Sequence, residues 1–354
     1  MFLTETNENY MQATSDAHFV SVVIPVLNEA KHIENCLRSI TKQDYPADKM
    51  EIFVVDGMST DGTPDIIRRL CEEDSRIKLL ENHKKNVPCA LNLGIKASKG
   101  DIIVRTDSHC IYPQHYVSTL VNKLLELDAW NVGGVWITSP ANDSTQCLAI
   151  AICSSHPFGT GPSLHKIGCE SITETDTVPF GCFKREVFDK IGLFDEDMLR
   201  NEDEELNGRI TRQGGKIYLI PEVEMRYMAR DRIDRMIKMF YQYGLWKPLV
   251  NKKVGNAVSY RQFAPPSFVA FVILGLLLSI FIPAVRYVVF PILLLYLAIT
   301  FIIGIIEAFK HKKIGLCLLV PLTFICIHFA YGTGYLKGFF SLLGKKSLSY
   351  TLDR

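Results

Sequence analysis

The sequence predicts an α/β domain with a mostly parallel central sheet, followed by transmembrane helices. Between residues 19 and 137, short apolar, β-branched segments alternate with segments of helical spacing, a pattern typical of βαβ units. After Pro266 the chain becomes strongly apolar, whereas nearly all acidic residues lie before residue 235. A soluble part followed by a membrane part explains this asymmetry.

The expected elements follow from the spacing of apolar residues. We expect strands at residues 19–24, 52–55, 77–80, 102–105 and 132–137. Helices are expected at residues 28–42, 64–73, 88–97, 116–127, 185–191, 204–212 and 233–246, and residues 154–166 form a Gly-, Pro- and Ser-rich loop that suits a mobile lid. Parallel sheets bind ligands beyond the carboxyl ends of their strands, which singles out residues 25–29, 56–63 and 107–109.

The chain divides into five parts on these grounds. They are an N-terminal tail (1–18), an α/β domain (19–230), an amphipathic interface helix and linker (231–262), a transmembrane region (263–340) and a C-terminal tail (341–354). The helix at 233–246 suits either an anionic membrane surface or a domain core. Residues 267–285, 287–306 and 314–336 are each close to the ~20 residues that a helix needs to cross a bilayer. The Gly332-Thr333-Gly334 sequence permits a broken or re-entrant third segment.

Charge predicts the orientation and excludes one class of partner. The basic loop Lys310–Lys313 and the basic approach to the first span favour the cytosolic side, by the positive-inside rule. The N-terminus has no signal-peptide pattern, so we expect a multi-pass cell-membrane protein whose catalytic domain is cytoplasmic. A net charge of +1 gives no indication of nucleic-acid binding. The ten scattered cysteines are interpreted as free thiols in a reducing compartment.

Three polar clusters can carry chemistry. Asp56, at a strand end, can fix a base or ribose, although Asp and Gly are also ordinary turn residues. Asp107-Ser108-His109 can place two ligands on one divalent cation. Alternatively, Asp107 caps the local backbone and His109 has no role in metal binding. The acidic run 202–205 can supply a base with a raised pKa, or form an acidic first helical turn.

Taken together, the order and spacing of these clusters resemble glycosyltransferase family 2, the inverting enzymes with a GT-A fold. The resemblance covers about residues 19–246. It is closest to enzymes of succinoglycan-type exopolysaccharide synthesis. The matching segments are 23–29, 56–63, 90–94, 100–103, 107–109, 158–161, 177–181, 192–196, 202–203 and 328–332.

The resemblance implies a role for each matching residue. Asp203, with Glu202, is implied as the catalytic base that deprotonates the acceptor hydroxyl. Asp107 and His109 are implied as ligands of Mn²⁺ or Mg²⁺ at the donor diphosphate. The residues implied in nucleotide-sugar binding are Pro25, Asn28, Glu29, Asp56, Asn92 and Asp107. The implied partners are a nucleotide sugar, UDP-linked, a polyprenyl-diphosphate-linked saccharide acceptor and the lipid bilayer.

Two departures from the family pattern bear on these roles. Gly57 stands where many members carry a second Asp, and His109 replaces the second Asp of the usual DxD. Imidazole is a softer ligand than carboxylate, which favours Mn²⁺ over Mg²⁺ if His109 binds the metal directly. Otherwise His109 orients a metal-bound water.

Other readings of the chain remain open. The segment Tyr241–Lys247 partly matches the QxxRW element of processive synthases. Two roles fit Trp246 in this segment: stacking on an acceptor sugar, or marking a membrane interface, which we favour. A processive polysaccharide synthase is therefore the alternative enzyme. A catalytically inactive sugar-nucleotide-binding scaffold is the alternative of another class. A transporter is disfavoured, because the apolar segments contain almost no polar residues.

Overall fold

The computed structural model of this chain describes residues 18–256 and 259–344. Its elements form two compact units. Of the described residues, the first unit holds those up to Val135 and Gly168–Arg226, and the second holds Trp136–Ile167 and those from Tyr227 onward. The chain therefore passes from one unit to the other three times. Residues 1–17 of the predicted N-terminal tail (1–18) and residues 345–354 of the predicted C-terminal tail (341–354) lie outside the described residues.

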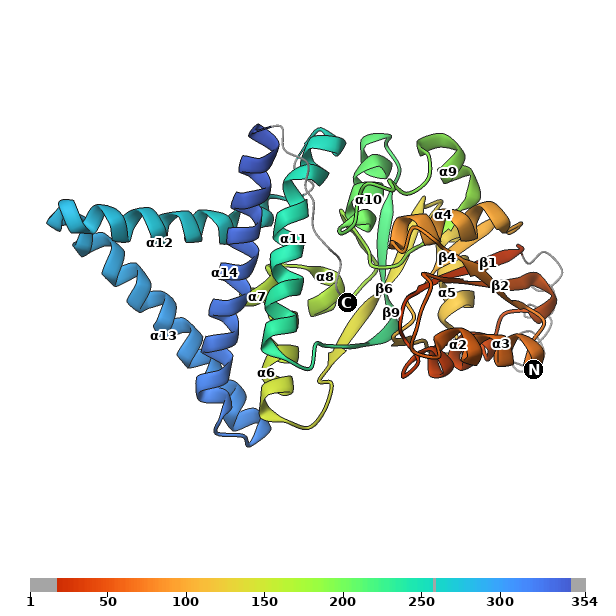
Figure 1. Cartoon of the computed structure of the whole chain (residues 1–354), viewed down its shortest axis with the longest axis horizontal. Helices are drawn as coiled ribbons and strands as arrows, with labels where there is room; N and C mark the ends of the chain where they lie inside the picture. Colours follow the sequence, from red (N-terminus) through yellow and green to blue (C-terminus); the bar gives the residue numbers. More distant parts are fainter. Residues whose placement is uncertain (1–17, 257–258, 345–354) are drawn as a thin grey trace, which may run out of the picture. The chain divides into compact units, whose positions relative to one another are not determined.

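The first unit contains a mixed sheet (Figure 1). Strands β1 (Val20–Val26), β2 (Met50–Asp56), β3 (Ile77–Glu81) and β4 (Ile102–Arg105) pair in parallel in the order β3-β2-β1-β4. The path continues through β8 (Cys182–Lys184), β6 (Asn131–Ser139), β9 (Ile217–Met228) and β5 (Cys110–Ile111), and β7 (Thr173–Glu174) pairs with β9. Strand β8 is antiparallel to both β4 and β6, so only the N-terminal half of the sheet is purely parallel.

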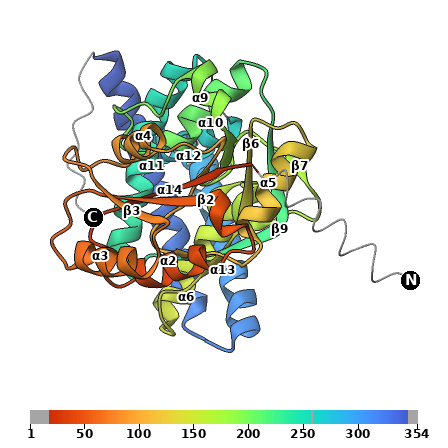
Figure 2. The ribbon, with the colours of Figure 1, turned by 90° about the vertical axis from the view of Figure 1, so that its right-hand side faces the viewer.

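Helices cover both faces of the parallel strands (Figure 2). Helices α4 (Val87–Ala97), α9 (Arg185–Ile191) and α10 (Glu202–Arg212) lie on one face, and α2 (Ile33–Thr41) and α3 (Thr63–Glu73) lie on the other. Helix α5 (Tyr116–Glu126) contacts β8. Every residue of β1, β2 and β4 is buried, as expected of strands that are covered on both sides.

The predicted strands of the first unit are all present, but the first helix is shorter than predicted. Helix α2 begins at Ile33 rather than at residue 28. The intervening residues form turns, and Asn28 adopts a left-handed conformation with φ of 54°. This conformation cannot continue into a right-handed helix, and it frees the polar groups after β1 for contacts with other loops.

The second unit is helical apart from the ends of β6 and β9. It contains α6 (Thr145–Ser155), α7 (Pro157–Thr160), α8 (Leu164–Ile167), α11 (Ile233–Val254), α12 (Ala264–Phe281), α13 (Arg286–His311) and α14 (Leu316–Leu343). Helices α7 and α8 occupy the segment expected to be a mobile loop. Apolar side chains of α6, α11 and α14 form its core, including Ile150, Phe240 and Phe324.

Helix α14 is continuous through Gly332-Thr333-Gly334, so the break that this sequence permits does not occur. The glycines serve close packing instead. A β-carbon at Gly334 or Gly338 would overlap backbone atoms of α11, and one at Gly332 would come within 2.7 Å of the Pro265 carbonyl oxygen of α12. Gly244 of α11 meets the backbone of α14 in the same way. Glycine at four-residue spacing is a common device for close helix contact in membranes.

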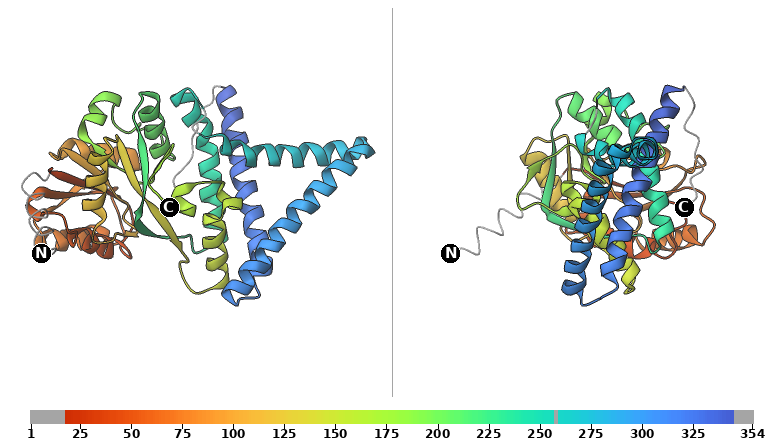
Figure 3. Two further views of the ribbon diagram at one scale, coloured as in Figure 1. Left: turned by 180° about the vertical axis from the view of Figure 1, so that it is seen from behind. Right: turned by 90° about the vertical axis from the view of Figure 1, so that its left-hand side faces the viewer.

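In the part of the chain that the structure describes, three helical segments are long and apolar enough to cross a membrane: Tyr260–Phe281, Pro283–His311 and Leu316–Leu343. The first two expose most of their apolar side chains, whereas half of the most apolar stretch of α14 is buried within the protein. Figure 3 shows α12 and α13 as two arms that join at the turn Pro283–Val285 and spread apart toward α14. Exposed apolar surface of this extent requires a lipid environment.

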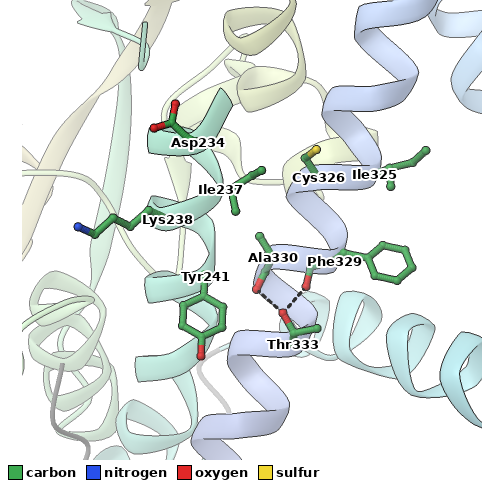
Figure 4. A pocket seen from close by; sticks show the side chains of 9 residues that line it. All are labelled: Asp234, Ile237, Lys238, Tyr241, Ile325, Cys326, Phe329, Ala330 and Thr333. Atoms are coloured by element: carbon green, nitrogen blue, oxygen red, sulfur yellow. Dashed lines mark hydrogen bonds between the residues drawn. The ribbon is translucent and has the colours of Figure 1, made fainter. Parts of the chain in front are cut away.

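An open groove of about 680 Å³ runs between α11 and α14 (Figure 4). Polar side chains lie on its α11 side, and its α14 side is mainly apolar. The lining residues are Asp234, Ile237, Lys238, Tyr241, Ile325, Cys326, Phe329, Ala330 and Thr333. The Thr333 hydroxyl donates to the carbonyl oxygens of Phe329 and Ala330 within its own helix, as hydroxyls in apolar helices commonly do.

Candidate active site

The loops after β1 and β2 are bound to each other at the carboxyl edge of the sheet. Asp56 is the last residue of β2, and its carboxylate accepts hydrogen bonds from the hydroxyl and the backbone N–H of Ser59, at 2.5 and 2.9 Å. The Ser59 hydroxyl oxygen in turn accepts from the backbone N–H of Asn28, and the Asn28 side chain accepts from Thr60. Two predicted site residues, Asn28 and Asp56, are thereby brought together, and Pro25 is buried within β1.

The loops after β1 and β4 also meet. His109 Nδ1 lies 2.7 Å from Asp107 Oδ1 and 3.7 Å from Glu29 Oε1. Tyr112 fixes the backbone of Asp107, because its hydroxyl accepts from the Asp107 N–H and donates to the Asp107 carbonyl oxygen. Each of the three titratable side chains is about one-fifth exposed, so solvent and ligands can reach them.

The spacing of Asp107 and His109 is compatible with a shared cation. Neighbouring ligands on an octahedral ion with bonds of about 2.1 Å lie about 3 Å apart, close to the 2.7 Å between Asp107 Oδ1 and His109 Nδ1. Within residues 18–256 and 259–344, however, no group of three or more His, Cys, Asp or Glu side chains is placed to hold a metal ion. Among the described residues, Asp107 and His109 are therefore candidates for two ligands, and any others would come from a bound diphosphate or water.

A buried arginine connects β4 to the first turn of α10. Arg105, the last residue of β4, donates from Nη1 to Asp203 and from Nη2 to Glu202 at 3.0 Å, and only 5% of its side chain is exposed. Its guanidinium lies over the ring of Phe180, 5.2 Å from the ring centroid. Phe180 has φ of 66°, an unfavourable conformation for a bulky residue that typically persists at functional sites.

This environment gives Asp203 the proton affinity of a useful base. Burial, with the negative charges of Glu202 and Asp107, raises the pKa of Asp203 to about 7, while Arg105 opposes the rise. About a quarter of the Asp203 side chain, 23%, nevertheless remains exposed. The carboxylate is thus held in place, accessible and half-ionised near neutral pH, a combination suited to general base catalysis.

Asn92 and Trp246, which the sequence singled out, are both buried. Asn92 of α4 is buried, and its side chain bonds both the N–H and the carbonyl oxygen of Phe194 and the carboxylate of Glu196. It therefore holds the turn after α9, and its implied role in nucleotide-sugar binding stays a prediction. Trp246, expected at a membrane interface, is 3% exposed within α11, because α14 packs along that helix.

Sequence reasoning missed Arg105, and it singled out Phe180 only as part of the matching segment 177–181. The signal for Arg105 was present, since an arginine that ends an otherwise apolar buried strand requires an anionic partner. Phe180 carries no comparable signal, because its role depends on a backbone conformation that the residue type disfavours.

Comparison with known proteins decides the family. The model of the family Glycosyl transferase family 2 matches residues 21–192. The succinoglycan biosynthesis protein ExoA of Rhizobium meliloti (strain 1021) is 31% identical over 261 residues, which span 73% of this chain and 78% of ExoA. The chain belongs to glycosyltransferase family 2. The predicted enzyme class is confirmed.

Relatives of this glycosyltransferase include a protein that matches along nearly its whole length. The dolichyl N-acetyl-alpha-D-glucosaminyl phosphate 3-beta-D-2,3-diacetamido-2,3-dideoxy-beta-D-glucuronosyltransferase of Methanococcus voltae is 27% identical over 333 residues, covering 91% of this chain and 97% of the relative.

A solved structure confirms the predicted GT-A fold of the glycosyltransferase. It is the mannosyltransferase PcManGT from Pyrobaculum calidifontis in complex with GDP-Man and Mn²⁺. The TM-score is 0.61 at 22% identity, over 91% of this chain and 88% of that one.

Proposed function

We propose that this glycosyltransferase moves a sugar from a UDP-linked donor to a saccharide carried on a polyprenyl diphosphate, with inversion at the anomeric carbon. The transfer takes place at the cytoplasmic face of the cell membrane, as a step in exopolysaccharide or cell-surface glycan synthesis. The names of the relatives from Rhizobium meliloti and Methanococcus voltae support this choice of pathway and of lipid-linked acceptor.

The observation that carries the proposal is the position of Asp203. Its carboxylate is held by Arg105, and burial raises its pKa to about 7. An acceptor hydroxyl that attacks the anomeric carbon must lose its proton, and Asp203 takes it. Glu202 is a positioning residue, because it engages the second nitrogen of the same guanidinium.

The donor binds at the loops after β1, β2 and β4. Pro25, Asn28, Glu29 and Asp56 contact the nucleoside, and Asp107 and His109 lie at the diphosphate and hold Mn²⁺ or Mg²⁺. The cation neutralises the departing nucleoside diphosphate. The contacts Asn28–Ser59 and His109–Glu29 support this arrangement, since they tie the three loops together before any donor binds.

The replacement Asp203→Asn tests the assignment of the base. It keeps the shape of the side chain and removes its basicity, so sugar transfer should fall by at least about a hundredfold while donor binding persists. Transfer is measured by mass spectrometry with UDP- and GDP-sugars and membrane-extracted lipid acceptors, with and without EDTA and added Mn²⁺.

A matched control is Asp65→Asn, which changes an exposed carboxylate on α3. Unchanged transfer by the Asp203→Asn protein would contradict the role of Asp203. Transfer from GDP-sugars alone would contradict the choice of uracil as the base.

A further inference from the structure

A buried set of polar side chains links the helix that carries Asp203 to the segment before β8. Asn131 at the start of β6 donates from Nδ2 to Asn207 Oδ1 of α10 at 2.8 Å. Asn207 Nδ2 in turn donates to the Thr177 hydroxyl oxygen at 2.8 Å and to the Val178 carbonyl oxygen at 3.3 Å. None of these residues is more than 4% exposed. We call Asn131, Thr177 and Asn207 the Asn207 network.

The partners of Asn207 admit one orientation of its amide group. The Val178 carbonyl oxygen can only accept a hydrogen bond, so a donor must face it. The nitrogen of Asn207 therefore faces Val178 and Thr177, and its oxygen faces the amide of Asn131. Rotation or sliding of α10 would break these bonds and leave polar groups unsatisfied in the core, which is costly. The Asn207 network thereby fixes the position of α10.

The segment that Asn207 holds leads directly to the ring that lies against Arg105. The chain bends at Phe180 and Gly181, whose φ angles are 66° and 84°. The Gly181 carbonyl oxygen accepts from the backbone N–H of Arg105 at 2.9 Å, so the bend is bound to β4. The bend thus brings the Phe180 ring to its place, 5.2 Å from the guanidinium.

These contacts form a closed ring that begins and ends on α10. Asn207 holds the segment that begins at Thr177, and this segment carries Phe180. The ring of Phe180 lies against Arg105, which donates to Asp203. Asp203 and Asn207 are four residues apart, so they lie one turn apart on the same side of the helix. Both ends of this turn are therefore held before any substrate binds.

The position of the base matters for catalysis. A general base must lie within hydrogen-bond distance of the proton that it removes, and a displacement of about 1 Å caused by a distant change can lower the rate by about a hundredfold. Arg105 must also stay in place, because it opposes the rise that burial causes in the pKa of Asp203. Residues that fix both groups can therefore control the rate without touching the substrates.

We propose that Asn207 and Thr177 are positioning residues of the transfer reaction, which hold Asp203 and Arg105 in place through the bend at Phe180. This inference rests on the proposed function, in which Asp203 is the base. It adds to the candidate active site two buried residues that act through others.

The first test replaces Thr177 by Val, which keeps the shape of the side chain and removes the hydroxyl. Asn207 then loses a partner, and the segment that carries Phe180 is held less firmly. We expect kcat of the full-length enzyme to fall by at least about tenfold, while the Kd for UDP, measured by calorimetry, stays unchanged. Thr177→Ser keeps the hydroxyl and should retain most of kcat.

The pH–rate profile separates positioning from a loss of folded enzyme. The charged groups that face Asp203 are Arg105, Glu202 and Asp107. If Thr177→Val displaces Arg105, the pKa of Asp203 rises and the acidic limb of the profile moves to higher pH. Partial unfolding lowers the rate at every pH and leaves the limb in place. In a protein that already carries Arg105→Gln, Thr177→Val should move the limb no further, because both changes act on the same ion pair.

Ser21→Ala is the matched control. Ser21 is fully buried near the start of β1, where its hydroxyl donates to Glu51 Oε1 at 2.8 Å and accepts from the Gly100 N–H at 2.8 Å. The substitution removes the same kind of buried hydrogen bond at the amino end of the parallel strands, away from the proposed base. It should lower the Tm and leave kcat and the acidic limb unchanged.

Three outcomes would overturn the inference. They are an unchanged kcat and limb in Thr177→Val, equal losses of kcat in Thr177→Val and Thr177→Ser, and an equal shift of the limb in Ser21→Ala. Each of them leaves the proposed function intact if transfer still requires Asp203.

A spectroscopic measurement distinguishes failure of the proposed function. The titration of Asp203 is followed by infrared difference spectroscopy against Asp203→Asn, which requires no turnover. If Thr177→Val shifts this titration but the protein transfers no sugar, the proposed function fails, whereas the link from Thr177 to Asp203 stands.

Discussion

Arg105 is the residue on which the candidate active site most depends. It ends a parallel strand, is almost fully buried, and engages both Glu202 and Asp203. The two carboxylates balance the charge of the buried guanidinium. Removing one partner from such a group costs about 3–5 kcal/mol of stability. Arg105 therefore supports the fold of this edge and also limits the proton affinity of the proposed base.

Replacing Arg105 by Gln should change the pH dependence of transfer. Asp203 acts as a base only when ionised, so the rate of the wild-type enzyme rises as the pH increases through about 7. Without the positive charge the pKa of Asp203 rises further, by about one unit or more. The acidic limb of kcat/KM should move to higher pH, and the rate at pH 7 should fall by about fivefold or more.

The pH–rate profile of Arg68→Gln, an exposed arginine of α3, provides the comparison. If the acidic limb of the pH–rate profile of Arg105→Gln stays in place or moves to lower pH, Asp203 is not the titrating base.

At the residue scale, the sequence could predict the residues that follow parallel strands. Asp56, Asp107 and His109 lie where the rule for strand ends places them. The rule could not reveal that the side chain of Asn92 hydrogen-bonds the backbone of Phe194, because that contact joins residues about a hundred positions apart. Nor could it show the left-handed backbone of Phe180.

At the scale of the elements, the long apolar strands were predictable and the short ones were not. Strands β5 and β7 have two residues each and β8 has three, too few to show any periodicity. Strand β9 alternates buried and exposed residues over much of its length, which marks an antiparallel strand with one covered face. The mixed half of the sheet arises from these elements.

The close contact of α11 and α14 supports a prediction about the second unit. Gly334→Leu should push the two helices apart, because a β-carbon at this position already overlaps the backbone at Tyr241. We expect the variant to lose at least about 1–3 kcal/mol of stability. The measurement is the Tm of the full-length protein in detergent, which should fall.

Gly344→Ala provides the control at the end of α14, where the nearest atom to an added β-carbon is an ordinary 3.5 Å away. Equal Tm values for the two variants would mean that the helices can separate without cost.

At the scale of the whole molecule, the charges flanking the candidate spans predict the topology. The turn between α12 and α13 and the basic loop after α13 should face opposite sides of the membrane, with the loop Lys310–Lys313 in the cytosol. An epitope inserted after Ala284 should be accessible to antibody in intact cells. An epitope after Lys312 should become accessible only once the membrane is opened.

Detection of both epitopes from the same side would contradict a complete crossing by α13. A tag at the exposed Asp65 of the first unit reports the side on which the catalytic domain lies.

The interleaving of the two units has a consequence for biosynthesis. The nascent chain releases α6 from the ribosome long before α11 and α14, against which its apolar face packs in the finished protein. Domains generally fold as units while synthesis continues, so the strands of the first unit can assemble while α6 still lacks its partners. Until the last apolar helix emerges, α6 needs a chaperone or the bilayer, and chains shortened before α11 should aggregate through it.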